Sequence, residues 1–156
     1  MNKNIIIFLF LLFAIAGGVY FFTSSSSSKN NSNEIVDVVT NLESLACDMN
    51  TNFSCPVTFK GKKINFSLSP RPAFVMQPVS MWIEGLNELN LKDPSLEIHG
   101  VNMEMGVIRA KLEKRENEYK ADIVLSACVI SLMRYRFEVM DEGKKTGLFI
   151  DLDLKQ

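Results

Sequence analysis

The stretch LMRYRFEVMDEGKKTGLFIDLDL, residues 132–154, decides the fold class. Apolar and polar side chains alternate before and after a turn at Glu142 and Gly143. Alternation with a period of two is typical of a strand with one buried face, and a glycine between two such runs is typical of a hairpin. We therefore predict two antiparallel strands whose inward residues are Met133, Tyr135, Phe137, Val139, Leu148, Ile150, Leu152 and Leu154.

Further alternating segments precede this hairpin and begin after Pro56. Pro70, Pro72 and Pro78 confine the chain before Val79 to a sheet edge or to interrupted strands, because proline cannot donate a ladder hydrogen bond. Short strands separated by Gly, Pro and charged turns are typical of an immunoglobulin-like antiparallel β-sandwich, and an open barrel is the alternative. We predict a domain of residues 57–156 with about seven strands. The candidate segments are residues 57–60, 62–68, 79–83, 95–102, 106–114, 119–127, 132–140 and 146–154.

A long apolar run lies near the start of the chain, where residues 5–22 read IIIFLFLLFAIAGGVYFF without a charge. At about 1.5 Å per helical residue this run spans roughly 27 Å, close to the thickness of a bilayer's hydrocarbon core. Lys3 supplies the positive charge on the cytoplasmic side. We predict an N-terminal transmembrane helix within residues 1–22 that anchors the rest of the chain outside the cytoplasm. A cleaved signal peptide is the alternative, although its apolar core is usually only about 7–15 residues long.

Two segments separate this anchor from the strands. Residues 23–33, TSSSSSKNNSN, contain no apolar side chain and are predicted to form a flexible linker. In residues 34–46 apolar side chains recur at helical spacing after a possible N-cap, Asn33, which predicts a short amphipathic helix. The segment of residues 34–56 thus consists of this helix and a loop with two cysteines.

All three cysteines lie beyond the predicted anchor, in a compartment where disulfides persist. Cys47 and Cys55 flank a polar loop, and a bridge between them would close about nine residues and add about 2.5 kcal/mol of stability by restricting the unfolded chain. We predict this disulfide. Cys128 is then left over, either as an inert buried thiol or as a ligand for a soft metal.

Charge and motif content argue against several functions. The chain has 17 Lys and Arg against 18 Asp and Glu, a formal net charge of -1, so no nucleic-acid partner is predicted. The sequence contains no Gly-rich phosphate loop and no G-x-S-x-G, H-E-x-x-H or C-x-x-C motif. His99 is the only histidine, and no serine stands in a recognisable nucleophile setting. We expect no enzymatic activity.

Soft donor atoms gather in one segment, HGVNMEMG, residues 99–106, and Cys128 and Met133 follow it. In an extended chain the two methionines of this segment point to the same face. Thioether, thiolate and imidazole ligands together suit Cu(I) better than hard cations. Ordinary core packing of the methionines is the alternative. We predict a copper site formed by Met103, Met105, Cys128 and His99.

The segment HGVNMEMGVIRAKLEKRENEYKADIVLSACVISLMRYRFEV, residues 99–139, resembles the FixH/YtkA-like group of membrane-anchored, extracytoplasmic immunoglobulin-like domains. The shared features are an M-x-M-G turn, a Y-x-A strand, a Leu-x-x-Cys step and a Met-x-Tyr strand. The resemblance implies a small bacterial accessory protein, in some relatives associated with copper delivery to, or assembly of, respiratory haem-copper oxidases. Met103, Met105 and Cys128 fall on matching motif positions, and His99 is added because it is close to them in the sequence.

These features lead to one functional expectation and one alternative. We expect a single-pass protein of the bacterial inner membrane whose C-terminal domain lies in the periplasm and binds Cu(I) or assists assembly of a copper-dependent respiratory oxidase. The alternative is a structural module that uses no metal and contacts a protein partner in a membrane complex. Its contact residues would be Trp82 and the edge segment around Pro78.

Overall fold

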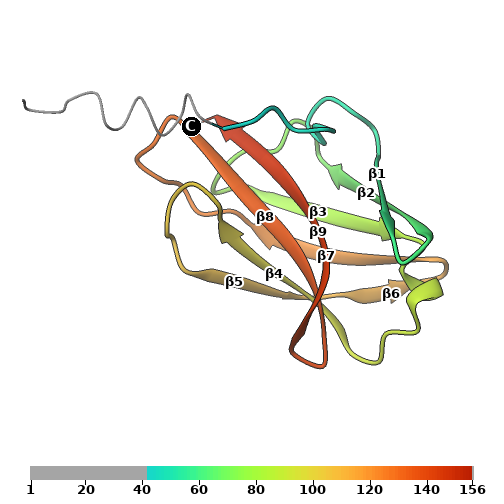
Figure 1. Cartoon of the computed structure of the whole chain (residues 1–156). Coiled ribbons are helices and arrows are strands. Elements are labelled where there is room, and N and C mark those ends of the chain that lie inside the picture. Colours follow the sequence, from blue (N-terminus) through green and yellow to red (C-terminus); the bar gives the residue numbers. More distant parts are fainter. Residues whose placement is uncertain (1–41, 156) are drawn as a thin grey trace, which may run out of the picture. The chain divides into compact units, whose positions relative to one another are not determined.

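The computed structural model describes residues 42–155, so the predicted anchor, the linker and most of the predicted helix lie outside the described residues. Within residues 42–155, nine β-strands form two antiparallel sheets, in the arrangement of a β-sandwich (Figure 1). The strands are β1 (Cys55–Phe59), β2 (Lys62–Ser69), β3 (Pro78–Glu84), β4 (Pro94–Gly100), β5 (Val107–Lys111), β6 (Glu113–Arg115), β7 (Glu118–Val124), β8 (Leu132–Asp141) and β9 (Lys144–Lys155), and a short 3-10 helix, η1 (Leu86–Leu89), follows β3. No helix in this part of the chain is long and apolar enough to cross a membrane.

The two sheets have five and four strands. The strand order is β1-β2-β3-β7-β6 in the larger sheet and β5-β4-β8-β9 in the smaller one. The chain therefore changes sheet between β3 and β4, between β5 and β6, and between β7 and β8. Figure 1 shows β4, β5, β8 and β9 as one layer and the remaining strands as the other.

Apolar side chains from both sheets meet in one core. All the inward residues predicted in the stretch of residues 132–154 are buried, which confirms the predicted inner face, although Arg134, Glu138 and Met140 on the opposite face of β8 are buried as well. Tyr135, Phe66 and Phe137 have the largest of the fully buried side chains. The β8–β9 hairpin thus supplies much of the core, as its sequence pattern predicts.

The predicted strand at residues 106–114 is in fact two strands that belong to different sheets. β5 pairs with β4 in the smaller sheet, whereas β6 pairs with β7 in the larger one. Leu112 lies between them with 4% of its surface exposed. Burial of this side chain between the layers lets the chain cross from one sheet to the other without breaking the alternation.

The prediction that Pro78 lies in an edge segment is wrong. Pro78 begins β3, which is paired on one side with β2 and on the other with β7. A proline is tolerated there because the first residue of a strand need not donate a ladder hydrogen bond. The alternative prediction, interrupted strands, is confirmed, since residues 70–77 separate β2 from β3.

Residues 42–54 form a strap that is held to both sheets. The predicted disulfide between Cys47 and Cys55 is present, with the two Cα atoms 5.7 Å apart, and ties the strap to β1. The Asn50 side chain donates to the carbonyl of Asp153 in β9 and accepts from the amide of Ala73, both at 2.9 Å. Met49 is fully buried in the core. The strap therefore closes one end of the domain.

The predicted helix does not extend to Ala46. Residues 42–46 contain no helical residue, while residues 34–41 lie outside the described part of the chain. The Glu43 carbonyl accepts a hydrogen bond from the Arg134 side chain at 2.7 Å. A tertiary contact thus occupies a carbonyl that a helix would use internally.

Candidate metal centre

Two loops meet beyond the ends of β4 and β7. The β4–β5 loop, residues 101–106, carries Met103 and Met105, and the β7–β8 loop, residues 125–131, carries Cys128. Figure 1 shows these loops as neighbours, in olive and orange. The Val101 amide donates to the carbonyl of Arg134 in β8 at 2.8 Å, which extends the pairing of β4 with β8 past Gly100.

Asn102 fixes the start of the β4–β5 loop against β8. Its Nδ2 donates to the Leu132 carbonyl at 2.9 Å, and its Oδ1 accepts from the Arg134 amide at the same distance. The side chain thus takes the place of a paired backbone group beside β8. Because Met103 is the next residue, these two bonds set where its side chain begins.

The loops bring two of the predicted ligands into contact. Sγ of Cys128 lies 2.7 Å from Sδ of Met103, although the residues are 25 positions apart in the sequence. Both side chains are partly buried and pack against the core. Thiolate and thioether sulfurs are the ligands that Cu(I) prefers, so this contact joins two donors of the right class.

Gly100 shows where the other sulfur-bearing side chains lie. A β-carbon at this position would overlap the carbonyl oxygen of Met103 and Cε of Met133, and would lie 3.2 Å from Cγ of Met105. Only glycine leaves room for these three groups. Met105 is partly buried like Met103, whereas Met133 is fully buried beneath them.

The structure sets His99 apart from this cluster. In β4 the side chains of Leu96 and Ile98 are buried, and neighbouring residues of a strand point to opposite faces. His99 therefore lies on the outer face, where its register partners are Arg136 and Val107. The structure brings Met103 and Cys128 into contact and places Met105 beside Gly100, whereas the histidine does not join them.

The charged residue between the two methionines points away from them. Glu104 is exposed, and its Oε1 accepts a hydrogen bond from the Gly106 amide at 3.3 Å. In residues 42–155 no three His, Cys, Asp or Glu side chains form a group that could hold a metal ion. The donor set of the candidate centre is thus one thiol with thioethers.

Three contributors are not among the ligands predicted from the sequence, although Met133 stands among the soft donors that follow residues 99–106. Met133 has the spacing of a core residue, and Gly100 and Asn102 act through space and backbone hydrogen bonds. The M-x-M-G motif next to a glycine and an asparagine was the available signal. This motif does not indicate that β8 supplies the backbone groups that bind the Asn102 side chain.

The Tyr135 hydroxyl holds the β7–β8 loop from below. It donates to the Ser126 carbonyl at 2.5 Å, and the tyrosine is fully buried. We predict that Tyr135→Phe lowers the free energy of unfolding by about 1 kcal/mol, the net value of one such hydrogen bond. Urea unfolding followed by the fluorescence of Trp82 measures this loss. Tyr119→Phe, at a partly exposed position, is the control and should change stability less; an equal loss in both variants would contradict the role of the Ser126 bond.

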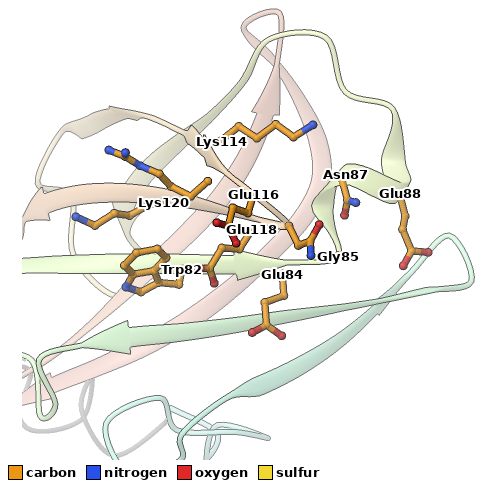
Figure 2. Close-up of a pocket in the computed structure, with 11 residues that line it drawn as sticks. Trp82, Glu84, Gly85, Asn87, Glu88, Lys114, Glu116, Glu118 and Lys120 are labelled. Carbon is orange, nitrogen blue, oxygen red and sulfur yellow. The ribbon is translucent and has the colours of Figure 1, made fainter.

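The outer face of the larger sheet carries Trp82, the contact residue of the alternative function. Trp82 is partly exposed, and Nζ of Lys120 lies 5.4 Å from the centroid of its ring. Figure 2 shows the ring beside Lys120. Both residues line an open hollow of about 1000 Å³ whose walls carry both charge signs. The residues that line this hollow fall within residues 82–88 and 114–120, outside the two sulfur-bearing loops.

Comparison with known proteins gave no relative: no family model, no curated protein and no solved structure matches the chain.

Proposed function

We propose that the chain is a membrane-anchored, periplasmic accessory protein of the bacterial inner membrane whose β domain binds Cu(I) and assists assembly of a copper-dependent respiratory oxidase. It is not an enzyme in this proposal. The ligands are Met103, Met105 and Cys128. The observation that carries the proposal is the 2.7 Å contact between the sulfurs of Cys128 and Met103, from two loops that are distant in the sequence.

The finer fold assignment, an immunoglobulin-like sandwich, belongs to the same proposal. Its support is the strand order, in which β3 pairs with β7 in one sheet and β4 with β8 in the other. A tyrosine early in one strand that donates to a backbone carbonyl a few residues upstream is typical of these domains, and the buried Tyr135 makes a related bond to Ser126, nine residues upstream. The anchor predicted at residues 1–22 and the resemblance to the FixH/YtkA-like group support the location.

Copper binding is tested on the purified chain in detergent. Ascorbate keeps copper as Cu(I) and, unlike thiol reductants, neither competes for the metal nor reduces the Cys47–Cys55 disulfide. Competition with a colorimetric Cu(I) chelator gives the affinity. We predict about one Cu(I) per chain, and an affinity about 100-fold weaker, or about 2.7 kcal/mol, in Met103→Leu/Met105→Leu.

The control for this variant is Met81→Leu, a methionine that is fully buried in β3. Leucine conserves volume at both sites, so packing changes little in either variant. Equal copper affinity in the wild type and the double variant would end the copper proposal.

The second candidate function is the metal-free interaction module, which the partly exposed ring of Trp82 beside Lys120 favours. Thermal unfolding separates the two functions. A ligand that binds only the folded state stabilises it by about 2.7 kcal/mol when its free concentration is 100 times Kd. Stabilisation by Cu(I) supports the first function, and unchanged unfolding at saturating Cu(I) supports the second.

A further inference from the structure

Met133 belongs to the hydrophobic core and also borders the loop that carries Met103 and Met105. It is fully buried at the start of β8, on the same face of the strand as Tyr135 and Phe137. Its Cε reaches the space directly over the Cα of Gly100, where a β-carbon would overlap it. The Met133 side chain therefore ends beside the loop that carries Met103 and Met105.

The crowding at Gly100 is a matter of space and not of backbone conformation. The φ angle of Gly100 is not positive, so other residues could adopt its backbone conformation. A side chain at position 100 is excluded because its β-carbon would overlap atoms of Met103 and Met133 and crowd Met105. The fold thus leaves out one side chain where the side chains of Met105 and Met133 meet the backbone carbonyl of Met103.

We propose that Met133 is a fourth sulfur ligand, which closes the buried side of the Cu(I) site formed by Met103, Met105 and Cys128. This inference rests on the proposed function. A thioether suits that place because it is uncharged and polarizable, so it can coordinate the metal from inside the core. An imidazole or carboxylate there would lose its hydration on burial and need a polar partner.

Charge balance points to the kind of ion that the site takes. When Cu(I) binds, the Cys128 thiol gives its proton to solvent, and thiolate and Cu(I) together are neutral. Three thioethers add no charge. A soft monovalent ion is therefore the match, and a divalent ion would leave a net positive charge against buried apolar side chains.

The test compares Met133→Leu with the wild type and with Met81→Leu, all as the full chain in detergent with ascorbate. Met81 is equally buried but belongs to β3 of the other sheet. We expect Met133→Leu to weaken Cu(I) binding about tenfold, or about 1.4 kcal/mol. X-ray absorption at the copper edge should show four sulfur neighbours in the wild type and in Met81→Leu, and three in Met133→Leu.

Each outcome separates this inference from the proposed function. Wild-type chain that binds no Cu(I) overturns both. Wild-type chain that binds Cu(I), with Met133→Leu of equal affinity and equal sulfur count, overturns the role of Met133 alone. A uniform loss of affinity in both leucine variants also overturns it, because the effect then follows from repacking of the core.

Discussion

Cys128→Ser is expected to abolish Cu(I) binding, with a larger effect than the loss of both loop methionines. Cysteine is the one ligand of the proposed set that carries a negative charge when it binds, and serine replaces it by a hard hydroxyl that stays neutral. We expect the affinity to fall more than about 1000-fold, or about 4 kcal/mol. Chelator competition with ascorbate present measures the loss.

A second substitution at this position separates charge from donor type. Cys128→Met keeps a soft sulfur but removes the negative charge, so we expect an affinity between those of the wild type and Cys128→Ser. Cys128 is partly buried, and serine is close to cysteine in size, so the fold should persist in Cys128→Ser. Circular dichroism checks this. Copper affinity that survives in a folded Cys128→Ser chain would remove the thiol from the site.

Alternation in the sequence predicted which side chains are buried, because a period of two reports the covered face of a strand directly. It does not report which strand pairs with which. Leu112 illustrates this: its alternation with Ala110 is intact, yet the chain changes sheet there. The sequence of β3 likewise does not indicate that this strand lies between β2 and β7, because sheet order depends on long-range pairing.

The candidate site could be predicted only in part for the same reason. Met103 and Met105 follow from a local motif, but the contact of Met103 with Cys128 depends on how two loops meet. His99 was included through closeness in the sequence, and strand alternation places it on the opposite face from Gly100. Proximity along a strand is a poor guide to a shared site, since neighbouring residues diverge.

An ion pair on the outer face of the smaller sheet is expected to contribute strongly to stability. Arg134 of β8 is 8% exposed even though it alternates with core residues. Its Nε and Nη2 donate to the two carboxylate oxygens of Asp153 at 2.7 and 2.8 Å, and Nη2 also donates to the Glu43 carbonyl of the strap. The hydrogen-bonded Asp153 carboxylate raises the pKa of Arg134 above its ordinary value, although burial opposes this.

We predict that Arg134→Met lowers the free energy of unfolding by about 3 kcal/mol, near the lower end of the loss when one partner of a buried ion pair is removed. The lower end applies because the Asp153 side chain is 23% exposed and keeps some hydration. Urea unfolding followed by Trp82 fluorescence measures the loss. The only tryptophan reports from β3, so a full shift of its transition also shows that both sheets unfold together.

Arg136→Met is the matched control, since Arg136 forms the same two-bond pair with Asp151, at 2.8 and 2.9 Å. Its side chain is 31% exposed, and its Cζ lies 4.0 Å from the centroid of the Phe149 ring. More exposed pairs contribute less, so we expect a loss of about 1 kcal/mol. Arg134→Met should also speed proteolysis within residues 42–46, because the bond to Glu43 is gone. Equal losses of stability in the two variants would mean that burial does not strengthen the Arg134–Asp153 pair. Equal rates of proteolysis within the strap would mean that Arg134 does not hold the strap.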